Sequence, residues 1–174
     1  MSATSPVLQT ARLRLDELTD DDADFVVELL NDPDFLLHIG DKQVRDITGA
    51  RRYLAEGPRA SYAAHGFGLW KATLLATGEA AGMCGLLKRE HLPDADIGYA
   101  WLPRFRGRGL AREAAEAVLA HAFGPLRRPR VLAIVSPGNT ASQQLLERVG
   151  MTSLGLRPVL DEPLLVYHLD APGG

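Results

Sequence analysis

Residues that build covalent or metal-held frameworks are scarce in this chain. It contains a single cysteine, Cys84, so an intramolecular disulfide cannot form, which suits a reducing cytoplasm. Its five histidines show no metal-ligand spacing, and neither His-Glu-x-x-His nor Cys-x-x-Cys occurs. We therefore expect a cytoplasmic protein without a metal, in which Cys84 is a small core residue.

Long apolar segments are also missing. No run approaches the ~20 residues that span a bilayer, so we expect no membrane partner. The first ten residues lack a basic segment followed by an apolar one, so we expect no signal peptide. With 46% hydrophobic and 24% charged residues, the composition is that of a folded domain, and the length fits one domain over residues 1–174.

Charge is unevenly distributed, although the net charge is only −3. Residues 101–130 carry seven arginines and two glutamates, a local charge of +5, so the rest of the chain carries −8. A basic segment on an acidic body favours a compact anionic ligand over DNA. A solvated charged face and an RNA- or ribosome-associated protein stay open as alternatives. One aromatic residue, Phe105, is interleaved with the arginines of 104–112, whereas stacking on bases needs several.

The spacing of apolar residues predicts alternating strands and helices. A strand is expected over 8–18, and a helix that follows a capping box at 19–22 is expected to end at 31–34. A second helix is expected over about 46–56, ended by Gly57-Pro58. The later elements are a hairpin over 67–90 that turns at 76–79, a strand within 95–103, a helix ending at Gly124, a strand over 130–135, a helix between Asn139 and Gly150, and a strand over 164–170. This order predicts a mixed α/β sheet.

The segment RFRGRG, residues 104–109, combines arginine with glycine before a predicted helix. A P-loop is excluded because no Gly-Lys-Ser/Thr occurs, and a dinucleotide fingerprint is excluded because Arg112 stands where a third glycine is needed. Glycine lets the backbone approach a phosphate, and the first turn of a helix offers unpaired N–H groups and the positive end of its dipole. We therefore expect this loop to bind a pyrophosphate.

The same six residues resemble R/Q-x-x-G-x-G/A, the acetyl-CoA pyrophosphate loop of the GNAT N-acetyltransferases. The segments TARLRL, GFGLWKA, IGYAWLP and NTASQQLLERVGM are similar, in family order, to segments of the Rim-type branch, which includes ribosomal-protein N-terminal acetyltransferases. Together they cover a core of about residues 8–169. The resemblance implies an α+β (mixed α/β) fold whose mostly antiparallel sheet of about seven strands is splayed between the fourth and fifth strands and flanked by about four helices.

The resemblance further implies acetyl-CoA as cosubstrate, with pantetheine lying between the strand at 95–103 and the strand at 130–135. The residues it assigns to coenzyme binding are Trp101, Leu102, Arg104, Arg106, Gly107, Arg108, Gly109, Leu110, Asn139 and Ser142. Trp101 and Leu102 would act through their backbone, where one N–H can polarise the thioester carbonyl. Trp101 and Tyr99 are equally expected as plain core residues. Asn139 binds the pantetheine amide, caps its helix, or does both.

Asp96 matches the carboxylate of the family's fourth strand. Directly or through a water, it could accept the proton of the attacking amine, whereas a surface aspartate at a strand start is the alternative. Asp94, Glu90 and His91 lie close by in the sequence and could serve instead.

The leaving thiolate needs a hydrogen bond or a proton. Many family members use a tyrosine at the position of Leu146, which is a clear departure in this chain. Ser142 matches a serine of the Rim-type branch, and we expect it to stabilise the thiolate or to relay a proton.

The resemblance therefore implies an enzyme, an acetyl-CoA-dependent N-acetyltransferase that acts by direct transfer in a ternary complex. Its acceptor would be a primary amine, either a small molecule or a protein N-terminus. A non-catalytic acyl-CoA-binding or sensing protein and a succinyl or longer acyl donor stay open as alternatives. His38, between the first helices, is a candidate contact to the acceptor, and a homodimer is left open.

Overall fold

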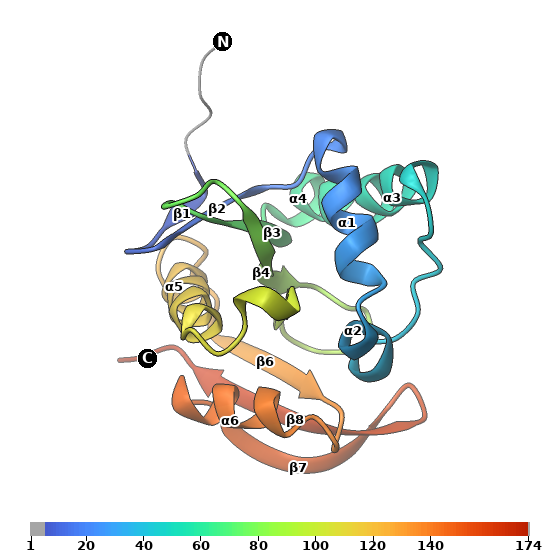
Figure 1. Ribbon diagram of the computed structural model, residues 1–174. Coiled ribbons are helices and arrows are strands. Elements are labelled where there is room, and N and C mark those ends of the chain that lie inside the picture. Colours follow the sequence, from blue (N-terminus) through green and yellow to red (C-terminus); the bar gives the residue numbers. More distant parts are fainter. Residues whose placement is uncertain (1–5, 174) are drawn as a thin grey trace.

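The computed structural model describes residues 6–173, which are organised around one eight-stranded sheet (Figure 1). Across the sheet the strands follow the order β1-β2-β3-β4-β5-β6-β8-β7, and all neighbours are antiparallel except β5 and β6. The expected mixed, mostly antiparallel sheet is confirmed, with eight strands rather than about seven. The strands are β1 (Leu8–Gln9), β2 (Leu13–Glu17), β3 (Leu69–Leu74), β4 (Ala80–Leu87), β5 (Asp96–Trp101), β6 (Arg130–Val135), β7 (Thr152–Val159) and β8 (Glu162–Asp170).

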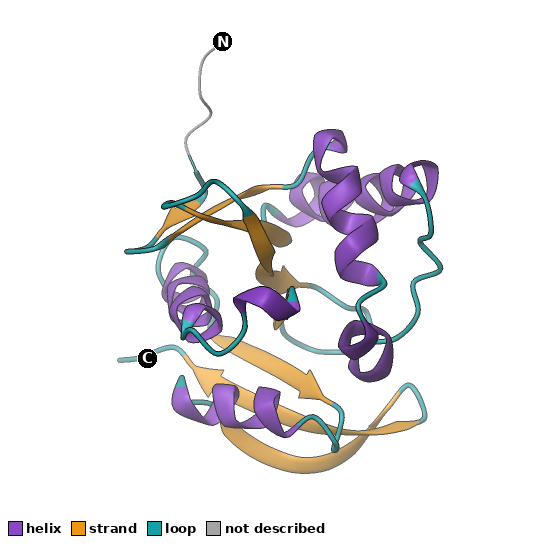
Figure 2. Ribbon diagram, viewed as in Figure 1, coloured by secondary structure: helices purple, strands orange, loops and turns teal. Residues whose placement is uncertain are grey.

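Helices cover both faces of this sheet (Figure 2). The helices are α1 (Ala23–Leu30), α2 (Pro33–His38), α3 (Ile47–Leu54), α4 (Ala60–His65), α5 (Leu110–Phe123) and α6 (Thr140–Arg148), with short turns η1 (Asp20–Asp22) and η3 (Pro103–Phe105). Trp70 of β3, Cys84 of β4 and Tyr99 of β5 are register partners and share one face of the sheet. That face carries α5, because the Trp70 ring packs edge-on against His121 at 5.6 Å. Helices α1, α3 and α4 lie together on the other side of β3 and β4 (Figure 1).

Local signals account for several element boundaries. The predicted capping box at 19–22 is present. The β3–β4 hairpin turns at Gly78, whose φ of +77° favours glycine. Asn139 caps α6 by accepting a hydrogen bond from the Ser142 N–H at 3.2 Å, and Gly150 follows the helix with a φ of +97°.

For the N-terminal helices, one prediction is wrong and one helix was not predicted. The helix expected to stop before Pro58 continues through a π-helical segment, η2 (Ala55–Arg59), into α4 and ends at Gly66. A π-helical turn is wider than an α-helical one, which accommodates a proline that has no N–H to donate. The chain also forms α2 where only a helix end was expected, since Asp32 caps it and Pro33 occupies its first position. Within residues 6–173, no helix combines the length and apolar character needed to cross a membrane.

Candidate active site

Strands β5 and β6 separate after a single point of contact. Their pairing is confined to Asp96 and Leu132, where the Leu132 N–H donates to the Ala95 carbonyl at 2.9 Å. Beyond this point β5 pairs only with β4, and β6 pairs only with β8. The expected splay between these strands is therefore present, and it opens towards their carboxyl ends.

The free edge of β5 presents hydrogen-bond donors to this splay. The Leu102 N–H donates to the Ala81 carbonyl at 2.9 Å, and in an antiparallel ladder every second residue bonds to the same neighbour. Tyr99 and Trp101 are the intervening residues, so their N–H groups point away from β4, to the side that β6 has left. The buried indole N–H of Trp101 also has no acceptor within residues 6–173. Trp101 thus offers free donors, whereas Leu102, the other backbone contact expected from the sequence, is engaged with β4.

The loop from Gly107 to the first turn of α5 forms an open row of amides. The six consecutive N–H groups from Gly107 to Arg112 have no acceptor in the described part of the chain. Gly107 and Gly109 have φ angles of +75° and +79°, a conformation that other residues rarely adopt. A Cβ at Gly107 would meet no atom within 4 Å, and the loop residues are exposed. The glycine spacing read from the sequence therefore corresponds to a strand–loop–helix segment with unpaired N–H groups, an arrangement that can bind an anion.

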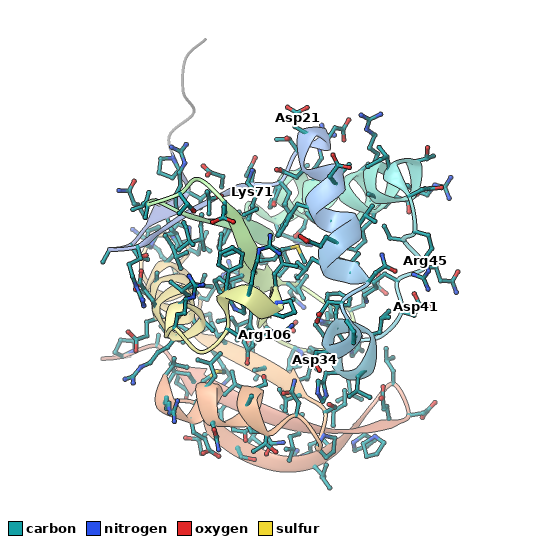
Figure 3. All side chains as sticks on the ribbon, viewed as in Figure 1. Asp21, Asp34, Asp41, Arg45, Lys71 and Arg106 are labelled. Carbon is teal, nitrogen blue, oxygen red and sulfur yellow. The ribbon has the colours of Figure 1, made fainter. Side chains whose placement is uncertain are left out.

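The arginine side chains of this loop bind other parts of the protein. Arg106 donates to the Asp32 carboxylate at 2.7 Å and to the Trp101 carbonyl at 2.6 and 3.0 Å. It also donates to Asp34 at 2.6 Å, and both of these side chains are labelled in Figure 3. Arg104 lies 3.3 Å from Glu28. Arg106 therefore connects the end of β5 to the start of α2, and its guanidinium donates its hydrogen bonds to other residues of the protein.

Two further arginine contacts hold the backbone of the loop. The Arg12 guanidinium donates to the Arg108 carbonyl at 2.8 Å and pairs with Glu113 of α5 at the same distance. Arg108 in turn donates to the Arg104 carbonyl at 3.0 Å. These contacts use carbonyl groups of the loop, and the N–H groups of residues 107–112 take no part in them.

Asp96 is buried at the point where β5 and β6 part. Its side chain is 1% exposed, and both of its oxygens lie 3.2 Å from the Arg89 guanidinium. Burial raises the pKa of Asp96 to about 6, although Arg89 acts in the opposite direction. The surface alternative for Asp96 is wrong. Because Asp96 and Tyr99 are three residues apart on one strand, the Asp96 side chain lies on the sheet face opposite to α5.

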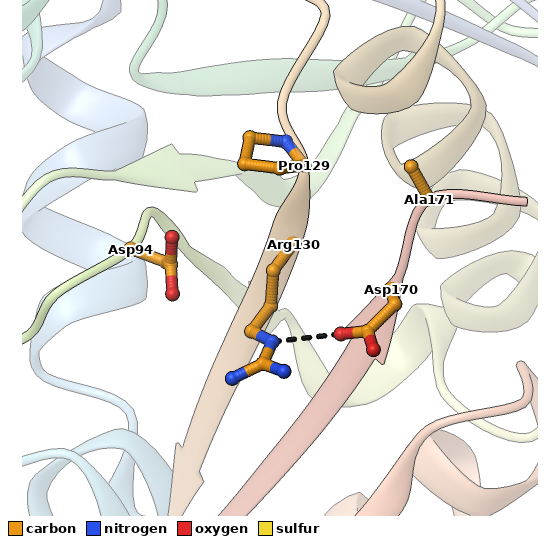
Figure 4. A pocket seen from close by; sticks show the side chains of 5 residues that line it. All are labelled: Asp94, Pro129, Arg130, Asp170 and Ala171. Carbon is orange, nitrogen blue, oxygen red and sulfur yellow. Dashed lines mark hydrogen bonds and ion pairs between the residues drawn. The ribbon is translucent and has the colours of Figure 1, made fainter. Parts of the chain in front are cut away.

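The other three candidate bases lie elsewhere. Glu90 and His91 are exposed. Asp94 lines an open depression at the start of β6 together with Arg130 and Asp170, which pair with each other at 2.7 Å (Figure 4). This depression is at the amino end of β6, away from the end at which the strands diverge.

Ser142 meets Tyr99 across the splay. Ser142 lies in the first turn of α6, is 8% exposed, and hydrogen-bonds through its hydroxyl to the Tyr99 hydroxyl. Burial raises the pKa of the Tyr99 phenol above its ordinary value. Leu146, at the position where the resemblance expects a tyrosine, is fully buried. The link between Tyr99 and Ser142 was not predicted, because no local pattern brings together residues that are 43 positions apart.

His38 and Cys84 occupy different surroundings. His38, at the end of α2, lies 3.5 Å from the Ser136 hydroxyl just after β6. It therefore borders the carboxyl end of the splay. Cys84 is fully buried, and burial raises the pKa of its thiol to about 12, as expected of a core residue. Within residues 6–173, His, Cys, Asp and Glu side chains form no cluster of three that could hold a metal.

Comparison with known proteins identifies the family. The model of the acetyltransferase (GNAT) domain matches residues 12–152. The protein YkkB of Bacillus subtilis (strain 168) is 32% identical over 164 residues, which are 92% of this chain and 94% of YkkB. An acetyltransferase structure from Agrobacterium tumefaciens str. C58 superposes with a TM-score of 0.82 at 29% identity, covering 97% of this chain and 96% of that one. The ribosomal L7/L12 α-N-protein acetyltransferase RimL, solved in complex with coenzyme A, has the same fold, with a TM-score of 0.80 at 16% identity over 97% of this chain and 99% of RimL. The chain therefore belongs to the GNAT acetyltransferase domain family and is an acyltransferase.

Proposed function

We propose that this enzyme transfers the acetyl group of acetyl-CoA to a primary amine by direct transfer in a ternary complex. The observation that carries the proposal is the row of free N–H groups from Gly107 to Arg112, which begins a few residues after the free edge of β5. A pyrophosphate needs several N–H donors and a positive potential, and the start of α5 supplies both. The shared fold of RimL, whose structure contains coenzyme A, supports this choice of cosubstrate.

The edge of β5 suits the pantetheine arm. The amides of the pantetheine arm can pair with a strand edge in the manner of an added strand. The N–H groups of Tyr99 and Trp101 are free to take part in this pairing. One of these donors would also polarise the thioester carbonyl. We place Asn139, Ser142 and Leu110 around the same arm and loop, with Asn139 also capping α6.

Asp96 is the proposed base. As the amine attacks, a C–N bond forms, the C–S bond breaks, and the electron pair stays on sulfur. Asp96 would accept the ammonium proton directly or through a water, and a carboxylate with a pKa of about 6 is both ionised at pH 7 and more basic than an ordinary aspartate. Ser142 would stabilise the thiolate by donating its hydroxyl proton in a hydrogen bond.

The basicity of Asp96 favours an α-amine as acceptor. An α-amine has a pKa near ~8, about two units above Asp96, whereas a lysine amine near ~10.4 is more than four units above it. Each unit costs about 1.4 kcal/mol of proton transfer, so lysine is the less suitable substrate. We therefore propose a protein N-terminus or a small-molecule α-amine.

Ion pairing argues against an RNA-binding function for the basic segment. Of its seven arginines, four pair with carboxylates of the protein, namely Arg104, Arg106, Arg112 and Arg130. Charges that are neutralised within the fold contribute little to the binding of a polyanion.

Release of coenzyme A thiol in the presence of an amine panel would separate catalysis from mere acyl-CoA binding.

Thermal unfolding tests the coenzyme site. Wild type is heated with acetyl-CoA, succinyl-CoA, coenzyme A, ATP or NAD. At a hundredfold excess over Kd we expect about 2.7 kcal/mol of stabilisation by acetyl-CoA, or roughly 5–10 °C in Tm for a chain of this size. Gly109→Trp should abolish this shift, because its Cβ would lie 3.4 Å from the Arg12 guanidinium that holds the loop backbone, and a side chain at this positive φ would strain the loop.

Gly78→Trp is the matched control. Gly78 and Gly109 have nearly equal positive φ angles, +77° and +79°, so both variants carry similar backbone strain, but Gly78 lies in the β3–β4 turn. Gly78→Trp should keep the full acetyl-CoA shift. No shift of wild type with any coenzyme A species would reject the proposed function.

A further inference from the structure

Tyr99 reaches from β5 across the splay to α6. Its ring belongs to the sheet face that carries α5, and its hydroxyl bonds to the Ser142 hydroxyl. The same hydroxyl lies 3.5 Å from the Ser142 carbonyl. One residue thus presents a backbone N–H to the splay and a side chain to the serine that the proposed function places beside the sulfur.

We propose that Tyr99 is a positioning residue for thiolate stabilisation, which holds the Ser142 hydroxyl so that its proton points at the sulfur of coenzyme A. This inference rests on the proposed function, since it requires coenzyme A to lie in the splay. The resemblance expects a tyrosine at position 146, where this chain has Leu146. The inference gives a role to a tyrosine at a different position, Tyr99.

The direction of the hydrogen bond follows from the chemistry of the two hydroxyl groups. Each can donate one proton and accept others, and the phenol is the more acidic of the two, so it is the better donor. When Tyr99 donates, Ser142 Oγ accepts, and the serine keeps its own proton free. Within residues 6–173, Tyr99 is the only partner of the Ser142 hydroxyl. That proton therefore has no competing acceptor in the protein.

Tyr99 keeps its own proton throughout. When the C–S bond breaks, the electron pair remains on sulfur, and the Ser142 O–H donates a hydrogen bond to it. A phenolate would be poorly solvated at this partly buried position, and burial raises the pKa of Tyr99 accordingly. The two hydroxyl groups therefore form a chain of two hydrogen bonds. The first, from Tyr99 to Ser142, orients and strengthens the second, from Ser142 to sulfur.

The ionisation of bound coenzyme A tests this role without an acceptor amine. The thiolate absorbs more strongly in the ultraviolet than the thiol, so a pH titration of the coenzyme A complex, minus that of the protein alone, reports the pKa of the bound thiol. The proteins are wild type, Tyr99→Phe, Ser142→Ala and the double variant, each with its Kd for coenzyme A measured by calorimetry. Tyr53→Phe is the matched control, because it removes the hydroxyl of another partly buried tyrosine, on α3, that is not bonded to Ser142.

Tyr99→Phe should lower the acid-dissociation constant of the bound thiol about threefold to tenfold, the effect of weakening one hydrogen bond to a charged group. Ser142→Ala should lower it at least as much, and the double variant should equal Ser142→Ala, because Tyr99 acts through the serine. The Kd for coenzyme A with a protonated thiol should change little in these variants. The pKa of the bound thiol should change little in Tyr53→Phe.

Three results would overturn the inference. Coenzyme A bound with an unchanged thiol pKa in Tyr99→Phe would remove the role of Tyr99 and leave the proposed function intact. Additive effects in the double variant would show that Tyr99 acts independently of Ser142. If Tyr99→Phe does not fold, an unchanged thiol pKa in Ser142→Ala still refutes the inference, whereas failure of wild type to bind coenzyme A would reject the proposed function as well.

Discussion

Replacing Asp96 by asparagine should stabilise the protein at neutral pH while removing its proposed base. Burial raises the pKa of this carboxyl from its ordinary value of 3.8 to about 6, despite the contact with Arg89. The folded state therefore holds a proton that the unfolded state has already released between these two values. Folding stability then decreases as the pH rises from about 4 to about 6, and the loss is complete above about 6.

The size of this effect follows from the shift in pKa. A difference of about two units between the folded and unfolded states corresponds to about 3 kcal/mol of lost stability at pH 7 to 8. Asparagine has the shape of neutral aspartic acid but does not ionise. Between pH 4.5 and pH 8, the free energy of unfolding of Asp96→Asn should therefore rise by about 2 kcal/mol relative to that of wild type. The rise is smaller than about 3 kcal/mol because wild type has already lost part of its stability at pH 4.5.

Urea unfolding of both proteins between pH 4.5 and pH 8 measures this difference, and contributions from all other titrating groups cancel in the comparison. Asp94→Asn is the control, since Asp94 is partly exposed and should show no such growth with pH. A stability difference that is constant with pH, or that favours wild type at pH 8, would refute the reasoning. The latter result would mean that the ion pair with Arg89 outweighs burial.

Two further predictions follow from the structure. Arg106→Ala should cost about 2–3 kcal/mol of unfolding free energy, because it removes the charged partner of the buried Asp32 carboxylate, which keeps only the Phe35 N–H, and the side-chain donor of the Trp101 carbonyl. Arg104→Ala, which breaks an exposed pair with Glu28, should cost under about 0.5 kcal/mol. Urea unfolding measures both, and equal losses would contradict the bracing role of Arg106. Cys84 should resist a disulfide reagent at pH 8 in the folded protein and react rapidly in 6 M guanidinium, because its buried thiol has a pKa of about 12. Fast reaction of the folded protein would show that Cys84 is accessible.

Features that depend on neighbouring residues could be predicted from the sequence. The turn at Gly78, the cap at Asn139 and the left-handed glycines of the loop follow from backbone rules that act over a few residues. The loop in particular is visible in the sequence, because two glycines at 107 and 109 directly precede a helical pattern. Local signals fail where a local preference is outweighed, as at Pro58, which ends most helices but here lies inside a π-helical turn.

Features that depend on tertiary contacts could not be predicted. Asp96 read equally well as a surface residue, and its perturbed pKa results from burial between β4 and β6, which the sequence does not show. Tyr99 and Ser142 are 43 residues apart, and Arg106 and Asp32 are 74 apart. Such pairs become visible only when the strand order is known, because no periodicity relates residues on different elements.

In the arginine–glycine segment, residues 104–109, the arginine side chains have contacts that differ from those the motif suggests. Three arginines beside two glycines suggest guanidinium groups aimed at phosphate, yet Arg104 and Arg106 bind carboxylates of α1 and of the start of α2. Arg108 and Arg12 bind carbonyl groups of the loop itself. An anion site made of amides needs its carbonyls turned away and its backbone held still, and these arginines do both. In our proposal, therefore, the arginines set the geometry of the loop, and the N–H groups of residues 107–112 bind the pyrophosphate.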